Sequence, residues 1–348
     1  MQIERINPVI AGYNVGMAYA GYDPTLNVSG NHSFSLSPGS FNQQVQTIIP
    51  GVSVDANSYN ASLNGLAPMG LNYRLNGNIS ESYGTRSDLP FASTSGGASI
   101  QLAQPLLKNF WIDATRENIL VSKKALKMSE LNFEFVVMRG VTQVEDAYYD
   151  LIAARENVKV QQMAMELAKR LLAENRQRVK VGTMAPLDVQ QAESQVATTQ
   201  AALLAAQAAE TFQQNNLKSL ISENYSSWPF VTIVPAESLT AVVQAFSLQD
   251  SWMKGMTMRP DLLQARTQLE SQDIVLKYSF NQLFPELDLV GSYGHNGGNS
   301  LGRDFGGVLN QISDGSSPFY SYGAQLIFPL SNRAAREAYK TSKAQKQQ

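Results

Sequence analysis

One uninterrupted helical segment limits the folds open to this chain more than any other feature. From Asp113 to Val181 the sequence contains no proline and a single glycine, Gly140. Asp113 is a suitable N-cap for a helix that starts there. At 1.5 Å per residue this helix would be on the order of 100 Å long. Few soluble globular domains could contain a helix of that length.

Apolar residues recur along this helix at every seventh position. A sustained seven-residue repeat is typical of a coiled coil with a narrow apolar seam. The repeat comprises Val137, Val144, Leu151, Val158, Met165, Leu172 and Val179. Val141 and Tyr148 supply the first interleaved positions, and the later ones are polar: Arg155, Gln162, Lys169 and Arg176. The sequence therefore predicts a coiled-coil helix that also borders water.

A turn and a returning helix follow this segment. Gly182 is placed to stop the first helix and Pro186 to open the next one. The returning helix is expected from Asp188 to about Ile221 and is rich in alanine, which allows close helix packing. A shorter helix is expected from about Asp261 to Leu283.

Other segments alternate between apolar and polar residues with a period of two. The first runs from Leu26 to Leu36, with Ser and Asn dominating the intervening positions. The pattern recurs at 71–79, 98–102, 287–293 and 320–328. Strict alternation predicts strands. A sheet with one apolar face and one Ser- and Asn-rich face suits a boundary between lipid and water, although a soluble β-sandwich would show the same pattern.

The chain also repeats a unit of helix, strand, loop, strand and helix. Residues 24–30 align with 285–291, 101–106 with 325–330, and 114–117 with 334–337. Two or three hairpins cannot close a barrel, which needs about eight strands, and lipid does not tolerate an open sheet. Several chains would therefore pool their strands. Incomplete outer helices and the absence of a signal peptide predict an internal fragment of a longer protein; the alternative is a complete protein with two frayed ends.

Composition argues against several classes of protein. Lys and Arg number 27 against 29 Asp and Glu, so the chain lacks the basic footprint of a nucleic-acid binder. The absence of cysteine excludes disulfide scaffolds, Cys-ligated metals and thiol catalysis. His32 and His295 are expected to be structural. No nucleophile, base and orienting group form a recognisable motif, so we expect no enzyme and no catalytic, cofactor-binding or metal site.

The glycine-rich stretch 294–307 lies between two expected strands and not before a helix. It therefore lacks the context of a phosphate-binding loop. We expect it to be an exposed loop.

Several motifs resemble those of TolC-like outer membrane efflux proteins. Residues 178–193 resemble the family's R-x-x-VGT-x-x-PLDV-x-x-AE turn, and 259–263 resemble its RPDL entry to the second repeat. Residues 104–107 and 284–287 resemble its strand–helix junctions. The resemblance extends from about residue 22 to residue 339.

The resemblance implies an α+β fold in which long coiled-coil hairpins form a periplasmic α-barrel. The β-hairpins of a homotrimer would form one shared barrel of twelve strands in the outer membrane, in contact with its lipid. The implied function is a passive exit duct of a tripartite efflux or type I secretion system, exporting small molecules or proteins. Its implied partners are a periplasmic adaptor protein and an inner-membrane transporter. The alternative is a non-channel structural or adhesive coiled-coil stalk with a β head.

The resemblance also implies a functional site at the helical turn. There the adaptor would bind and the tunnel would close at rest. The implied site residues are Arg178, Val181, Gly182, Thr183, Pro186, Leu187 and Asp188. Asp188 matches an acidic gating position, but an acid in a first helical turn also interacts favourably with the helix dipole.

These expectations divide the chain as one discontinuous unit. Residues 1–23 would end a periplasmic helix, 24–104 would form the first β-hairpin with a long extracellular insertion, and 113–222 the periplasmic helical hairpin. Residues 223–258 would be an equatorial region, 259–283 the helix of the second repeat, 285–329 the second β-hairpin and 333–348 the start of a truncated helix. Within the insertion, 59–65 and 71–79 form an extra extracellular hairpin, or else the barrel strands are assigned wrongly.

Overall fold

The computed structural model describes residues 2–44, 46–86, 89–222, 228, 231–237 and 245–348. The chain forms two compact units. The first comprises Met1–Arg5 and Leu131–Asp261, and the second comprises Ile6–Glu130 and Leu262–Gln348. Part of the expected equatorial region, 223–258, lies outside the described residues.

The first unit is built on two long helices that run antiparallel. They are α2 (Ala114–Lys180), from Leu131 onward, and α3 (Pro186–Ile221). Two ion pairs join them, Arg155 with Glu210 at 3.4 Å and Arg176 with Glu193 at 2.7 Å. A further helix, α4 (Leu248–Met258), begins after Ser247, whose hydroxyl accepts a hydrogen bond from the Asp250 N–H at 3.3 Å. The sequence did not predict α4.

The core of this unit follows the seven-residue repeat of α2. Leu151 is completely buried and packs with Ala147 and Leu217. Val158 is also buried. The sequence predicts the second seam position four residues after each repeat position. The structure instead buries side chains three residues after the repeat positions, and these are small or polar: Ala147, Ala168 and Asn175. Arg155 and Arg176 flank the seam and pair with α3, as flanking positions of a heptad do.

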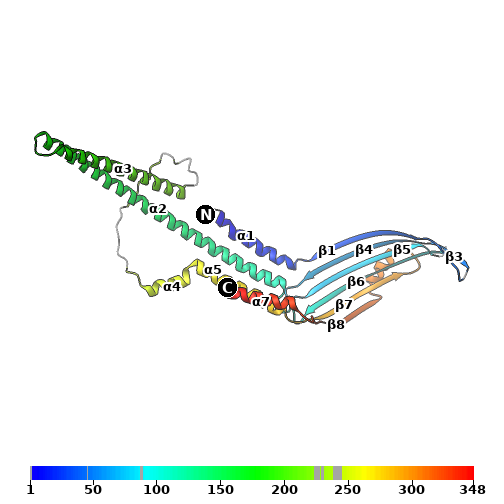
Figure 1. The fold of residues 1–348 in the computed structure, drawn as a ribbon. Helices are drawn as coiled ribbons and strands as arrows, with labels where there is room; N and C mark the ends of the chain where they lie inside the picture. Colours follow the sequence, from blue (N-terminus) through cyan, green and yellow to red (C-terminus); the bar gives the residue numbers. More distant parts are fainter. Residues whose placement is uncertain (1, 45, 87–88, 223–227, 229–230, 238–244) are drawn as a thin grey trace. The chain divides into compact units, whose positions relative to one another are not determined.

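The second unit contains a six-stranded antiparallel sheet (Figure 1). Its strands, in their order across the sheet, are β1 (Thr25–Ser37), β4 (Val52–Leu66), β5 (Asn72–Arg86), β6 (Leu89–Pro105), β7 (Glu286–Asn299) and β8 (Pro318–Ile327). A short hairpin of β2 (Ser40–Asn42) and β3 (Thr47–Ile49) lies in the connection between β1 and β4.

Although the extra hairpin expected from 59–65 and 71–79 is present, since Tyr59 pairs with Ile79 and Gly65 with Tyr73, the sheet corrects the assignment of residues 24–104 to a first hairpin of β1 and β6 that carries a long insertion. These residues form four long strands, and β1 and β6 are not neighbours because β4 and β5 lie between them. Strand β4 pairs with β1 from Asn64 opposite Thr25 to Val52 opposite Ser37. The alternation of β4 is hard to read in the sequence because Asp55 and Asn57 occupy its otherwise apolar face.

The helices of this unit meet the sheet at one end (Figure 1). Helix α1 (Gln2–Tyr19) leads through the 3₁₀ turn η1 (Ala20–Tyr22) into β1, and α5 (Pro260–Asn281) leads into β7. Strand β6 leads into α2, and β8 leads into α7 (Arg333–Gln347). This is the repeated unit predicted from the sequence. Among the described residues, no helix combines the length and the apolar character needed to cross a membrane.

A short helix replaces part of the expected glycine-rich loop. Residues up to Asn299 belong to β7, and α6 (Phe305–Ser313) packs against β6 and β7. Val308 of α6 is completely buried. The Thr94 hydroxyl accepts a hydrogen bond from the Asp304 N–H at 3.1 Å. The two glycines of α6 lower its intrinsic helix propensity, so tertiary packing decides its conformation.

The core of the helical hairpin provides the first test. We expect Leu151→Ala to lower the free energy of unfolding by about 2–5 kcal/mol, because it opens a cavity at a fully buried position. Glu166→Ala is the matched control, since Glu166 is exposed on the same helix and its ion pair with Arg170, at 3.9 Å, is worth about 0.5 kcal/mol or less. Thermal unfolding followed by circular dichroism measures both. Equal losses in the two variants would contradict the assignment of the core.

Candidate functional site: the helical turn and the two faces of the sheet

The turn between α2 and α3 has a defined hydrogen-bonded geometry. The Gly182 N–H donates to the Val179 carbonyl at 3.0 Å, and the Thr183 N–H donates to the Arg178 carbonyl at 3.0 Å. These two bonds form a Schellman motif, in which the residue after the helix adopts the left-handed conformation. Gly182 has φ +77°. A glycine is favoured here because a side chain would strain this backbone.

Helix α3 begins with Pro186, and Asp188 helps to fix that start. The Ala185 N–H donates to the Asp188 carboxylate at 3.2 Å, and the Asp188 N–H donates to the Ala185 carbonyl at 3.1 Å. Because alanine has no side-chain acceptor, only the carboxylate half of a capping box is formed. Asp188 therefore has a structural role whatever else it does.

The turn brings the predicted site residues together and leaves its apolar side chains in contact with solvent. Val181 is 68% exposed and Leu187 is 62% exposed. Arg178 forms an ion pair with Glu174 within α2. The Thr183 hydroxyl donates to the Arg178 carbonyl at 3.0 Å, which reinforces the end of α2.

The sheet has two chemically different faces. Strand register places one large apolar side chain of each strand in a single row across one face, which we call the apolar row. Its members, from β1 to β8, are Leu26, Leu63, Leu75, Ile100, Tyr293 and Tyr320. The outer members are well exposed, with Leu26 at 67% and Tyr320 at 73%. Exposed apolar surface of this extent on a folded sheet marks an interaction face.

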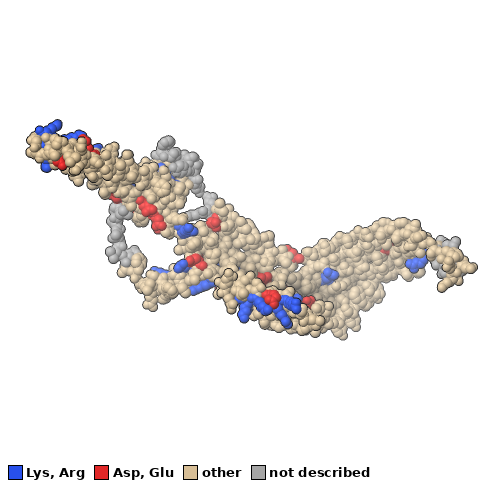
Figure 2. All heavy atoms as spheres, in the orientation of Figure 1, with Lys and Arg blue, Asp and Glu red and all other residues tan. Residues whose placement is uncertain are grey.

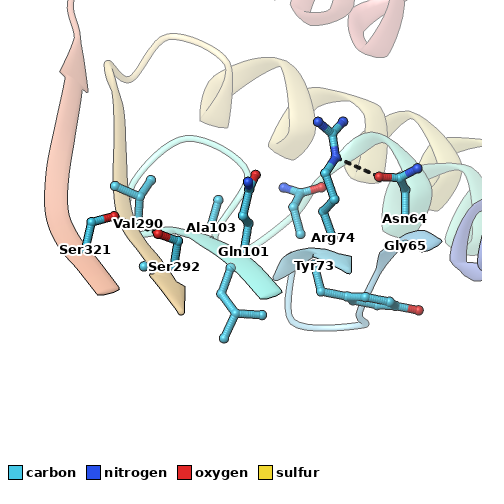
Figure 3. Close-up of a pocket in the computed structure, with 12 residues that line it drawn as sticks. Asn64, Gly65, Tyr73, Arg74, Gln101, Ala103, Val290, Ser292 and Ser321 are labelled. Carbon is cyan, nitrogen blue, oxygen red and sulfur yellow. Dashed lines mark hydrogen bonds between the residues drawn. The ribbon is translucent and has the colours of Figure 1, made fainter. Parts of the chain in front are cut away.

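The opposite face carries a polar row one residue away along each strand, because successive side chains of a strand point to opposite faces. Its members are Thr25, Asn64, Arg74, Gln101, Ser292 and Ser321. Arg74 Nε donates to Asn64 Oδ1 at 2.7 Å, and the hydroxyls of Ser292 and Ser321 are 2.7 Å apart. Five of these residues line an open depression of about 490 Å³ (Figure 3).

Few charged side chains interrupt the surface over the strands in the view of Figure 2. Where charged side chains do occur on the strands they have partners, since Glu81 Oε2 on the apolar face lies 3.4 Å from Arg303 Nη2 and Arg74 on the polar face donates to Asn64. Apolar-out and polar-in alternation is the pattern of a membrane β-barrel wall around an aqueous lumen.

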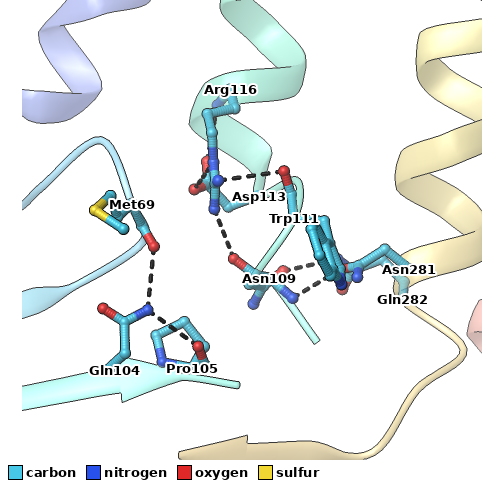
Figure 4. A network of polar contacts seen from close by, with 9 residues as sticks. All are labelled: Met69, Gln104, Pro105, Asn109, Trp111, Asp113, Arg116, Asn281 and Gln282. Atoms are coloured by element: carbon cyan, nitrogen blue, oxygen red, sulfur yellow. Dashed lines mark hydrogen bonds and ion pairs between the residues drawn. The ribbon is translucent and has the colours of Figure 1, made fainter. Parts of the chain in front are cut away.

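A polar network holds the end of β6 against the start of α2 and the end of α5 (Figure 4). Asp113 caps α2, since its carboxylate accepts from the Arg116 N–H at 2.8 Å and from Arg116 Nε at 2.7 Å. Arg116 Nη2 donates to the Asn109 carbonyl at 2.8 Å. The side chain of Asn281 accepts from the Asn109 N–H at 2.7 Å and donates to the Leu107 carbonyl at 3.2 Å.

The two repeats share one backbone feature at these junctions. Asn109, between β6 and α2, has φ +64°, and Asn332, between β8 and α7, has φ +39°. Asparagine tolerates the left-handed region better than most residues. The same turn chemistry therefore redirects the chain from strand to helix in both copies.

Burial also changes the titration of groups beside this network. Burial raises the pKa of the Glu117 carboxyl. Burial raises the pKa of Tyr278, and the negative charges of Glu117 and Asp113 raise it further. The folded state therefore binds the Glu117 proton more tightly than the unfolded state does. The stability from this proton is fully present below the unfolded pKa and is lost as pH rises through the raised folded pKa.

Comparison with known proteins agrees with this architecture. The family described as outer membrane efflux protein matches residues 10–223. The pyoverdine export outer membrane protein OpmQ of Pseudomonas aeruginosa is 26% identical over 234 residues, which are 66% of this chain and 45% of OpmQ. The chain thus spans about half the length of this curated relative.

Solved structures show the same fold. The outer-membrane channel OprN matches 99% of this chain and 65% of its own, with a TM-score of 0.63 and 16% identity. The CmeC outer membrane channel of Campylobacter jejuni matches 99% of this chain and 63% of its own, with a TM-score of 0.55 and 16% identity.

The chain belongs to the outer membrane efflux protein family. The predicted α+β fold and the predicted family are confirmed. Its location is the outer membrane, in a family of channels and not of enzymes.

The strand–helix junction provides the second test. We expect Asn281→Ala to lower the free energy of unfolding by about 1–3 kcal/mol, because the buried Asn281 side chain, 4% exposed, is lost together with its hydrogen bonds to the Asn109 N–H and the Leu107 carbonyl. Gln268→Ala, at an exposed position of the same helix, should change it little. Thermal unfolding of both variants checks this, and a loss no larger than that of the control would contradict the role of Asn281.

Proposed function

We propose that this chain forms part of a passive exit duct through the outer membrane, in a homotrimer that pools its strands. The two-faced sheet carries this proposal. Its apolar row would face lipid and its polar row would face the aqueous lumen. Among the described strands, β1 and β8 each pair on one side only. Unsatisfied backbone groups in lipid cost several kcal/mol each, so other copies would have to cover these two edges.

The proposed duct would export small molecules or proteins as part of a tripartite efflux or type I secretion system. The polar row is mostly uncharged, which suits a wall that conducts solutes without binding them tightly. The export of pyoverdine, named for OpmQ, supports small-molecule export as the first case to test. An inner-membrane transporter would supply the energy, and an adaptor protein would connect it to the helices in the periplasm.

The turn between α2 and α3 is the proposed contact with the adaptor. Val181 and Leu187 offer exposed apolar side chains for that contact. Gly182, Thr183 and Pro186 fix the backbone that presents them. The charge of Asp188, beyond its capping bond, would contribute to closing the tunnel at rest.

Two neighbouring positions on β6 test the orientation of the sheet. Leu102 lies on the face of the apolar row, and Gln101 belongs to the polar row. We expect Leu102→Lys to reduce assembly in the outer membrane, because a lysine facing lipid costs up to about 2–4 kcal/mol. Gln101→Lys should assemble normally and shift the ion selectivity of the pore toward anions.

The measurement combines outer-membrane yield with reversal potentials in planar lipid bilayers, using the assembly extracted from the outer membrane. Normal yield for both lysine variants, together with no conductance from the unsubstituted protein, would favour the coiled-coil stalk over the duct.

Asp188 separates gating from capping. Asp188→Asn keeps an oxygen that can accept from the Ala185 N–H but removes the charge. We expect it to raise the resting conductance and to lower the free energy of unfolding by no more than about 0.3–1 kcal/mol, because the side chain keeps the cap but loses its charge interaction with the helix dipole. Asp188→Ala should raise the conductance and lower the free energy of unfolding by about 0.5–1.5 kcal/mol more, because it also removes the hydrogen bond from the Ala185 N–H. If Asp188→Asn conducts like the unsubstituted protein, Asp188 is a helix cap only.

A further inference from the structure

The β4–β5 hairpin gives this chain six strands where a trimer of twelve strands would take four from each chain. We propose that β4 and β5 belong to the wall of the barrel, so that three copies close eighteen strands around a wider lumen. Such a lumen admits bulkier hydrophilic cargo than a twelve-stranded one. This inference rests on the proposed trimeric duct but concerns its size.

In both rows, on the two faces of the sheet, the side chains of β4 and β5 have the same polarity as their neighbours on β1 and β6. Leu63 and Leu75 continue the apolar row between Leu26 of β1 and Ile100 of β6. On the opposite face, Asn64 and Arg74 continue the polar row. If the hairpin lay in water outside the membrane, its residues in line with the apolar row would not have to be apolar.

The turn between β4 and β5 is built into the strand–helix junction. Gln104 Nε2, at the end of β6, donates to the Met69 carbonyl at 3.1 Å (Figure 4). Gly70 has φ +80°, and a Cβ at this position would lie 3.0 Å from the Asn109 carbonyl oxygen and 3.1 Å from Arg116 Nη2. The turn therefore fits closely against the network that holds α2 to the sheet.

Both inserted strands are paired on their two sides. Strand β4 pairs with β1 and β5, and β5 pairs with β4 and β6. Side chains add to the ladders, since the hydroxyls of Ser53 and Thr85 are 2.8 Å apart and those of Ser80 and Ser95 are 3.0 Å apart. To leave the wall, the hairpin would have to break the ladders to β1 and to β6 along their whole length.

The strand number sets the width of the lumen. At equal tilt, barrel diameter rises almost linearly with the number of strands, so eighteen strands give a diameter about 1.5-fold that of twelve. With strands about 4.8 Å apart and a tilt of about 40°, the backbone diameter is roughly 36 Å for eighteen strands and roughly 24 Å for twelve. A barrel with the larger diameter is in the size range of barrels that enclose an open aqueous channel.

Cysteine pairs can test the strand neighbours directly because the chain has no native cysteine. Asn27 of β1 lies directly opposite Ser62 of β4. Ser99 of β6 lies in the same row beyond β4 and β5, about 14 Å from Asn27 at the usual strand spacing. A disulfide requires Cα atoms within about 7 Å. In the assembled protein of the outer membrane, we expect Asn27→Cys with Ser62→Cys to cross-link upon oxidation, and Asn27→Cys with Ser99→Cys to remain reduced.

Ser292→Cys with Ser321→Cys is the positive control, because these hydroxyls touch across β7 and β8, outside the inserted hairpin. A cross-link between positions 27 and 99, or none between 27 and 62 while the control pair cross-links, would overturn the proposal.

Electron cryomicroscopy of the same assembly then counts the strands. Eighteen strands in a closed barrel support the proposal, and twelve strands with β4 and β5 outside the wall overturn it. Failure of the proposed duct can be distinguished from failure of this inference. A protein that shows no conductance or no closed barrel would contradict the duct, whereas the cysteine pairs show independently whether β4 or β6 lies next to β1. As a functional readout, the size limit for polymers that enter from the sheet side should increase by at least about 1.5-fold in diameter over a twelve-stranded channel of the same family, because inward side chains narrow both lumens by the same amount.

Discussion

An amphipathic sheet with two open backbone edges determines how this chain can be placed between lipid and water. One face presents apolar side chains and the other presents Ser, Asn and Gln, so the sheet suits neither water alone nor lipid alone. Strands β1 and β8 keep one unpaired side each among the strands described. A closed wall between lipid and water satisfies both faces and both edges at once, and a single chain of six strands is too small to build a wide one.

The strand–helix junctions fix the direction in which the helices leave the sheet. Each repeat leaves the sheet through a left-handed asparagine, Asn109 or Asn332, and then starts a helix. Around Asn109, partly buried backbone groups form hydrogen bonds with side chains from α2 and α5. These bonds hold the chain in that direction, because a different direction would break them.

Local periodicity predicted much of this fold, and the exceptions have physical causes. The alternating strands, the seven-residue repeat, the Gly182 turn and the N-cap at Asp113 are each encoded within a few residues. Strand β4 was only partly recognised because Asp55 and Asn57 interrupt its apolar face, where they meet His32 and Glu81 of neighbouring strands. Helix α6 was missed because tertiary packing of Val308 overrides two glycines. The functional role of the turn rests on motif resemblance, whereas the capping bond of Asp188 requires the structure.

If the sheet is part of an assembled outer-membrane wall, the protein must fractionate with the outer membrane. Density-gradient fractionation of the native cell envelope, with an antibody against residues 113–222, measures this. We expect a signal in the outer-membrane band that migrates, on an unheated gel, well above the 38.1 kDa of this chain. A signal in the soluble fraction at about that mass would show that the sheet is not part of such a wall, because the apolar row would then have to be buried within a single soluble chain.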